Sequence, residues 1–344
     1  MRNIRDIEII KAVIHIMDNS MEEPVLNDLE LQLDEEVVDF IKGHIIKSTG
    51  DEDAKCAVFN EGQSIMGDYV NEILQDEGLF LEKSREIART FFNYTRISED
   101  MQSGDLIVCL FNCEYGKTMG VMKLDYNRTY IHNIDYIDER MSINILPQMI
   151  GLPGKGQRLN NAFFVCPENQ GYNVLLIDRK SKKNSESGEN IKPLNELLNC
   201  SIITDKRTMT RNIINTSEKW IRENIKDDAG AQEKARSTIS KALRSDDVVN
   251  LETVAHYAFE NNEDMKKEYI DTLISSGLDK LEVPVDRDWA ENKLKRKKLK
   301  IDSDIDIYIN SNAYEDSGRF EVKRNGDGTI NIVIKHVRNY IEKP

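Results

Sequence analysis

The sequence has no run of apolar residues long enough to cross a membrane. A transmembrane helix needs about 20 predominantly apolar residues in succession, and no segment of this 344-residue chain approaches that length. The first residues, MRNIRDIEIIKAVIHIMD, carry acids inside their apolar run and lack a small-residue cleavage site, which argues against a secretory signal. These absences predict a cytoplasmic protein with no membrane partner.

Cysteine is scarce and irregularly spaced. The chain has five cysteines, an odd number: Cys56, Cys109, Cys113, Cys166 and Cys200. Scattered cysteines in a large chain indicate reduced thiols rather than a disulfide framework. Cys109 and Cys113 are close in sequence, but no second cysteine or histidine pair completes the four ligands of a zinc site. We expect no metal and no cofactor.

The chain also lacks an excess of positive charge, which argues against a protein that coats DNA with its whole surface. Its 47 basic and 61 acidic residues give a net charge of −14. Residues 1–100 hold 23 acids and 10 bases, whereas the rest holds 38 acids and 37 bases. A polyanion should be repelled by the first part, while a local cationic patch can persist in the second. The acidic first hundred residues are either an interaction surface for a basic partner or a solubilising face.

No catalytic signature is present. The segment at 151–156, GLPGKG, departs from both the Walker A and the dinucleotide-binding spacings and is typical of a turn. The five histidines are far apart in sequence and define no catalytic set. Glu321 and Lys323, beside Asp304 or Asp306, resemble the acid–acid–lysine set with which some nucleases hold Mg²⁺. Alternating strands produce this pattern often by chance, so we expect no catalytic residues and keep a metal-dependent nuclease as a distant alternative.

Hydrophobic periodicity predicts an α+β protein of two domains, residues 1–200 and 201–344. In the first, we expect a strand over 5–17, a helix capped by Asp34 that runs to Ile46, and a helical region over 64–97 broken near Gly78. From Gly104 the period changes to two, and further strands follow in an antiparallel or mixed sheet flanked by the helices. The expected strands are a hairpin over 104–125, then Tyr130–Ile137, Ser142–Met149, Ala162–Cys166 and Val174–Asp178. The polar run at 179–190, or a point near Ser201, marks the expected domain boundary.

The second domain is predicted to be a helical module that ends in a small β-meander. Apolar residues recur at helical spacing in four successive segments of 205–277. Pro284 precedes a helix that Asp286 is placed to cap, over 287–300. Strands are then predicted at 305–310, 320–322 and 330–334, the last two joined by the Asn325–Gly328 turn.

The strongest cationic run of the chain lies in that expected helix. Its members are Lys293, Lys295, Arg296, Lys297, Lys298 and Lys300. In a helix, Lys293, Arg296, Lys297 and Lys300 would share one side, from which they can meet successive phosphates. The alternative is a solvated face whose lysine stems cover apolar neighbours. Nothing in this run offers base readout, so DNA binding would be largely independent of sequence.

Two segments resemble the bacterial nucleoid-associated proteins of the YejK type. VPVDR (Val283–Arg287), followed by a short helix and paired strands, resembles the C-terminal end of that family, and Gly104–Asp125 looks like its central strand pair. The likeness extends over most of the chain. It implies a cytoplasmic protein of the nucleoid that associates with DNA, and it assigns no individual DNA-contacting side chains.

The combined prediction is a non-enzymatic nucleoid-associated protein that binds DNA phosphates through the basic run. An adaptor that reaches the nucleoid through protein partners, such as DNA-processing proteins, is the alternative that the acidic first hundred residues favour. The sequence leaves the oligomeric state open, a homodimer included.

Overall fold

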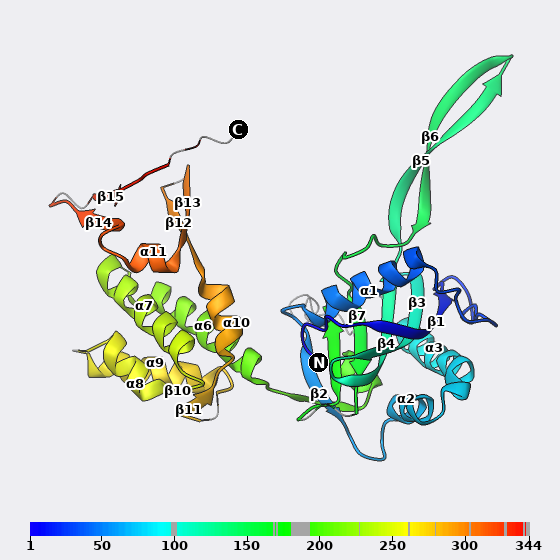
Figure 1. Ribbon diagram of the computed structural model, residues 1–344, viewed down its shortest axis with the longest axis horizontal. Coiled ribbons are helices and arrows are strands. Elements are labelled where there is room, and N and C mark those ends of the chain that lie inside the picture. The colour runs from blue at the N-terminus through cyan, green and yellow to red at the C-terminus, as the bar shows by residue number, and fades with distance from the viewer. Residues whose placement is uncertain are drawn as a thin grey trace. The chain divides into compact units, whose positions relative to one another are not determined.

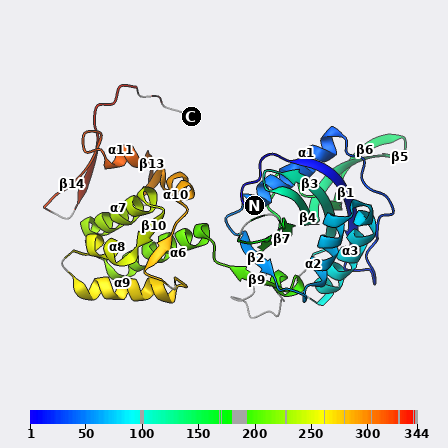
Figure 2. The same cartoon turned by 60° about the horizontal axis from the view of Figure 1, so that its bottom comes forward.

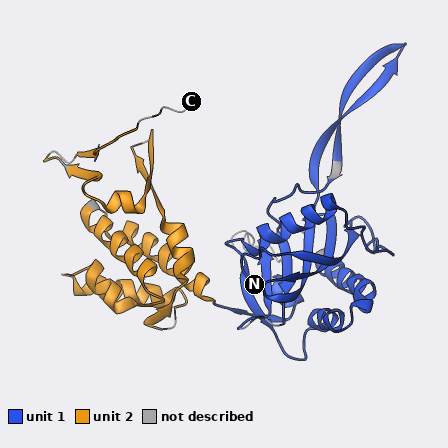
Figure 3. Cartoon of the chain, in the orientation of Figure 1, with its two compact units in different colours: residues 1–204 blue, residues 205–344 orange. Residues whose placement is uncertain are grey.

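The computed structural model describes residues 1–97, 102–179 except 168 and 170, and 193–341 except 227, 261, 279, 303, 327, 328 and 340. The chain divides into two compact units, Met1–Thr204 and Asp205–Pro344 (Figure 3). The polar run that we interpreted as a boundary lies, beyond Arg179, outside the described residues. Residues 1–204 hold 34 acids and 21 bases, and residues 205–344 hold 27 acids and 26 bases, so nearly all of the net charge lies in unit 1.

Unit 1 is built on a seven-stranded sheet of order β1-β3-β4-β7-β8-β2-β9, in which every pairing is antiparallel. Its strands are β1 (Glu8–Met17), β2 (Lys55–Phe59), β3 (Gly104–Cys113), β4 (Gly116–Asp125), β7 (Asn161–Val165), β8 (Val174–Asp178) and β9 (Cys200–Ile203). Its helices are α1 (Glu35–Thr49), α2 (Ile65–Gln75), the 3₁₀ turn η1 (Glu77–Leu79), α3 (Phe80–Ile97) and α5 (Leu194–Leu197).

Helices cover both faces of this sheet (Figures 1 and 2). In β3, Leu106, Val108 and Leu110 pack in the cluster that contains α2 and α3. Ile107, Cys109 and Phe111 alternate with them and pack in the cluster that contains α1. Because neither face meets water, the strand is a continuous apolar run, as expected for a doubly covered sheet.

Two predicted strands do not join the sheet. β5 (Asn127–Ile137) and β6 (Arg140–Gly151) pair only with each other and form a hairpin that projects from unit 1 (Figure 1). Their strand character is as predicted, but their expected place in the helix-flanked sheet is wrong. We call this hairpin the arm.

Unit 2 begins with four helices, as the four amphipathic segments predict. They are α6 (Lys206–Asn224), α7 (Ala229–Ser245), α8 (Leu251–Ala258) and α9 (Glu263–Ser275). A separate core joins them, in which the rings of Trp220, Phe259 and Tyr269 lie 5.0–5.4 Å apart. Two short strands, β10 (Val248–Asn250) and β11 (Glu282–Pro284), pair beside this bundle.

The C-terminal elements of unit 2 are α10 (Arg287–Leu294), β12 (Arg296–Ile301), β13 (Ile305–Asn310), α11 (Ser311–Glu315), β14 (Phe320–Arg324) and β15 (Ile330–Ile334). β12 pairs with β13 and β14 with β15, and the two pairs form separate sheets. The α+β class is confirmed, whereas the single meander that we expected is two hairpins separated by α11.

Candidate nucleic-acid interface

The predicted basic helix over 287–300 is helical only as far as Leu294. Asp286 caps it as expected, accepting a hydrogen bond from the backbone N–H of Trp289 at 3.0 Å. From Arg296 the chain is a strand, in which Leu299 lies opposite Ile307 and Ile301 opposite Ile305. These cross-strand apolar pairs outweigh the helix propensity of the lysines between them. The predicted helical stripe of Lys293, Arg296, Lys297 and Lys300 is therefore wrong.

A strand sorts its side chains onto two faces, and this divides the cations of β12. Arg296, Lys298 and Lys300 are exposed on one face, and Lys297 is half-buried on the other. Residues two apart in a strand are separated by about 6.6 Å, so the exposed face presents an evenly spaced row of three positive charges. Lys293 and Lys295 are exposed at the end of α10, just before this row.

One cation of the row is neutralised and two are not. Lys298 forms an ion pair with Asp306 (Nζ–Oδ2 2.9 Å) and lies 5.3 Å from the ring centre of Tyr308. The hydrogen bond with Asp306 raises the pKa of Lys298. Within the described residues, Lys295, Arg296 and Lys300 form no ion pair. Residues 293–310 contain six bases and three acids, so the segment is positive in a unit that is close to neutral.

Lys297, on the inner face, is held by its own unit. Its Nζ lies 4.0 Å from the centre of the Tyr314 ring, a cation–π geometry. Burial lowers the pKa of Lys297, against the opposing influence of Glu315 and Glu233. The Tyr314 hydroxyl donates a hydrogen bond to Glu233 of α7, and burial raises the pKa of this phenol. Lys297 therefore packs β12 onto unit 2 and is not placed as an outward ligand.

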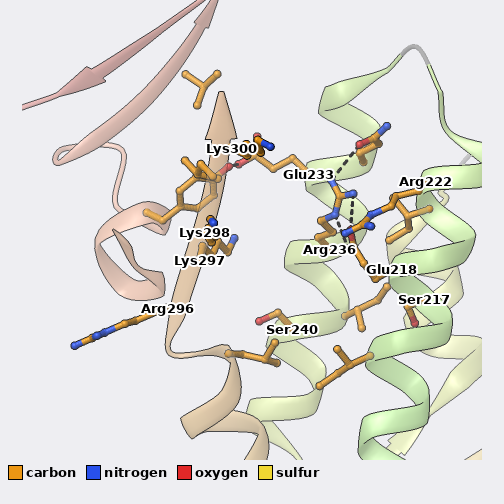
Figure 4. A pocket seen from close by; sticks show the side chains of 18 of the residues that line it. Ser217, Glu218, Arg222, Glu233, Arg236, Ser240, Arg296, Lys297, Lys298 and Lys300 are labelled. Carbon is orange, nitrogen blue, oxygen red and sulfur yellow. Dashed lines mark hydrogen bonds and ion pairs between the residues drawn. The ribbon is translucent and has the colours of Figure 1, made fainter. Parts of the chain in front are cut away.

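β12 also borders a cavity of about 700 Å³, whose other lining residues come from α6, α7, Leu294, Tyr314 and the β14–β15 hairpin. Apolar side chains such as Ile239, Leu243 and Leu299 line part of it, and charged side chains line the rest (Figure 4). Arg236 of α7 binds both carboxylate oxygens of Glu218 of α6, at 2.8 and 3.0 Å, and Arg222 binds the same carboxylate at 2.8 Å.

This ion-paired group joins α6 to α7. Partial burial alone would raise the pKa of Glu218, but the hydrogen bonds from Arg236 and Arg222 outweigh it, and the pKa is lowered. In Figure 4, Arg296 points away from these helices. Arg296, Lys298 and Lys300 are exposed but are also among the residues that line the cavity, so the row lies at its rim.

Two of the carboxylates of the nuclease alternative, Glu321 and Asp306, are paired with lysines. Glu321 pairs with Lys335 at 2.5 Å, and Asp306 pairs with Lys298 of the other hairpin. In the described part of the chain, no group of three or more His, Cys, Asp or Glu side chains is arranged to hold a metal ion. Residues 152–156 form a loop, as predicted, in which Lys155 pairs with Asp39 of α1 at 2.7 Å. No helix among the described residues combines the length and apolarity needed to span a membrane.

Residues 13–342 match a family described as nucleoid-associated protein YejK. The chain belongs to this family. No curated protein matches it at a significant level. The resemblance that Val283–Arg287 and Gly104–Asp125 indicated is thus confirmed, and the YejK-family match includes most of unit 1 and nearly all of unit 2. The β12 row lies in the matched part of a nucleoid-associated protein.

Sequence reasoning missed the contribution of α6, α7 and α11 to this region. The spacing of Glu218 and Arg222 is that of an ordinary exposed helical pair and gives no sign of a cavity. Arg236 and Tyr314 reach the region only because α6 packs against α7 and α11 follows β13. Local periodicity contains no signal for such contacts.

Proposed function

We propose that this YejK-family protein binds DNA through its phosphate backbone, using the outward face of β12 and the cationic end of α10. The observation that supports this most is the row of Arg296, Lys298 and Lys300, in which two cations lack an acidic partner. Lys293 and Lys295 extend the positive surface. Lys297 belongs to the run in sequence but acts in packing β12 on Tyr314.

The physical basis of binding is counterion release. Each phosphate neutralised by a lysine or arginine frees condensed cations from the duplex, which drives association and makes it salt-dependent. Unit 2 carries 27 acids and 26 bases, so a local positive field is not cancelled by the unit that holds it. The acidic unit 1 opposes DNA and confines binding to this patch.

The proposed contacts read no base sequence. Lysine and arginine side chains on an exposed strand meet phosphates through charge, and phosphate contacts carry no sequence information. Binding should therefore be nearly equal for duplexes of unrelated sequence. The proposal includes no chemical step and requires no cofactor, and DNA incubated with the protein and Mg²⁺ should stay intact.

The test is a DNA-binding titration of the full chain against two short duplexes of unrelated sequence, followed by fluorescence anisotropy. The triple substitution Arg296→Glu, Lys298→Glu and Lys300→Glu should weaken binding at least tenfold to both duplexes, since three phosphate contacts become repulsive.

A charge-matched control separates the patch from the net charge. Lys219, Lys226 and Lys267 are exposed in unit 2, outside the β12 hairpin, and form no ion pair within the described residues. Their substitution by glutamate changes the net charge by the same amount and should alter affinity much less than the β12 variant. Equal losses in the two variants, or unchanged binding in the β12 variant, would contradict the proposal.

The second candidate is an adaptor that reaches the nucleoid through a protein partner. The acidic excess of unit 1, 34 acids against 21 bases, favours it. Under this function the β12 variant keeps its nucleoid localisation in cells, whereas charge neutralisation on unit 1 abolishes it. Imaging both variants side by side distinguishes the two functions.

A further inference from the structure

The arm of unit 1 is not part of the proposed DNA-binding surface. Its strands pair without interruption from Thr129 opposite Gln148 to Ile137 opposite Arg140. Asp138 and Glu139 form the turn at the tip, both with positive φ, 49° and 62°, as the favoured two-residue hairpin turn requires. At about 3.3 Å per residue, the paired region extends roughly 26 Å from the body of unit 1 (Figure 1).

The register sorts the arm into two chemically different faces. One face carries large apolar side chains that are 49–74% exposed: Tyr130, Ile134, Tyr136, Met141, Ile143 and Ile145. The opposite face is mainly polar, with Thr129, Asn133, Asp135, Arg140, Ser142, Asn144 and Gln148 beside the apolar Ile131, Ile137 and Leu146. His132 is the only titratable imidazole, carboxylate or amine on the apolar face. An amphipathic ribbon of this kind is typical of a strand pair with one covered face.

The described part of unit 1 leaves all six side chains exposed, with the Arg128 guanidinium 5.3 Å from the Tyr130 ring centre at the base of the face. A two-stranded hairpin alone in water is marginally stable at best and needs a third strand or a packed face. The contiguous apolar surface therefore indicates an interaction site.

We propose that the apolar face of the arm is covered by the same face of a second copy of the chain. Six side chains that expose on the order of 100 Å² each would bury about 600 Å² per copy, or about 1,200 Å² in total, which is the lower limit for a stable specific interface. The contact is isologous: a twofold axis through the stacked ribbons lays each face on its equivalent. A dimer that dissociates at low protein concentration follows from this area.

Charge does not prevent a second copy from docking on the arm. The arm, Asn127–Gly151, holds two bases and three acids, whereas unit 1 as a whole holds 34 acids and 21 bases. Two such units repel each other at contact distance. Stacked arms about 26 Å long keep the acidic bodies apart by more than the Debye length of about 8 Å at physiological salt. DNA fits this face poorly, because its paired positions carry no lysine or arginine and the neighbouring Arg128 guanidinium lies over the Tyr130 ring at the base of the arm.

The test is sedimentation velocity of the full chain over a wide concentration range. Ile134 and Ile143 lie opposite each other at the centre of the proposed interface. Both are replaced in the variant Ile134→Thr/Ile143→Thr. Threonine keeps strand propensity, so the arm should stay folded while its face becomes polar. The wild type should form a dimer at the higher concentrations, and the variant should raise the dissociation constant at least tenfold.

The opposite face provides a matched control. Ile131 and Leu146 are also paired across the strands and are 49% and 43% exposed, comparable to Ile134 at 49% and Ile143 at 62%. The variant Ile131→Thr/Leu146→Thr removes the same number of apolar side chains and should leave the dissociation constant within twofold of the wild type. A wild type that is monomeric throughout, or two variants with equal effects, would overturn the proposal. DNA affinity of a monomeric variant, measured at a concentration where the wild type is also monomeric, should be unchanged.

Discussion

The two exposed hairpins of this molecule are both antiparallel strand pairs, but they differ in which set of side chains faces water. In β12–β13, the apolar positions Leu299, Ile301 and Ile307 are half-buried and the alternating cations are exposed. In the arm, the apolar positions are exposed, up to 74% at Tyr136, and the opposite face is mainly polar. Strand alternation creates two faces in both cases, and the surrounding unit decides which face is left for a partner. One hairpin is therefore suited to a polyanion and the other to an apolar surface.

The largest expected difference between the two hairpins is in the salt dependence of the binding that each is proposed to mediate. If the β12 row neutralises three phosphates, the affinity for DNA should fall roughly 40-fold when monovalent salt rises from about 50 to about 200 mM. Association through the arm buries no ion pair and should not weaken with salt, because salt screens the repulsion between the acidic units. Anisotropy titrations and sedimentation in the same two buffers measure both quantities. A shared steep dependence would show that the arm also depends on charge.

Mild acid should lower the folding stability of unit 1, which carries the arm, more than that of unit 2, which carries β12–β13. His15 of β1 is fully buried, and its Nδ1 accepts a hydrogen bond from the backbone N–H of Asn27 at 3.1 Å. The proton of the neutral ring is then on Nε2, which lies 3.3 Å from the Ser84 hydroxyl. Burial, followed by the nearby Arg85 and Arg89, lowers the pKa of His15 from 6.5 to about 4. A proton added at Nδ1 would face the N–H of Asn27.

The sign of the pH effect follows from this shift. Between pH 6.5 and about 4 the unfolded chain binds the proton and the folded chain does not, so unit 1 loses stability as the pH falls. The loss between pH 7 and pH 5 should be about 2 kcal/mol. Both tryptophans, Trp220 and Trp289, lie in unit 2. Urea unfolding followed by circular dichroism and by tryptophan fluorescence therefore distinguishes the units.

The variants of this experiment are two histidine substitutions. His15→Gln should reduce the pH dependence of unit 1 between pH 7 and pH 5 and leave the part that comes from the buried His44, whose pKa burial also lowers. His132→Gln on the exposed arm should leave the pH dependence unchanged. The tryptophan signal of unit 2 should not follow the same pH dependence. An undiminished acid effect in His15→Gln would assign the sensitivity to another group.

Sequence reasoning succeeded where local signals decide the structure. Asp34 and Asp286 cap the helices they were expected to cap, and the hairpin expected over 104–125 is the antiparallel pair β3–β4. It failed where tertiary pairing decides. The lysine-rich segment after Leu294 has good helix propensity, but Ile305, Ile307 and Ile309 provide an apolar strand for it to pair with. The segments Tyr130–Ile137 and Ser142–Met149 are strands, as predicted, but nothing in their sequence indicates that they leave the sheet.

The difference between strand and helix at β12 yields the smallest and most discriminating prediction. In the expected helix, Lys297 shares a side with Arg296 and Lys300. In the strand, it lies on the opposite face, 4.0 Å from the Tyr314 ring centre.

Lys297→Met preserves an unbranched stem against that ring and should change the affinity for DNA by less than twofold. Arg296→Met removes one exposed cation and should weaken binding about threefold to fivefold, in line with the loss of a single phosphate contact. Anisotropy titrations of the two single variants at low salt make the comparison. Equal losses would indicate that Lys297 leaves Tyr314 to meet DNA, and a larger loss in Lys297→Met would show that the inner face of β12 carries the contact.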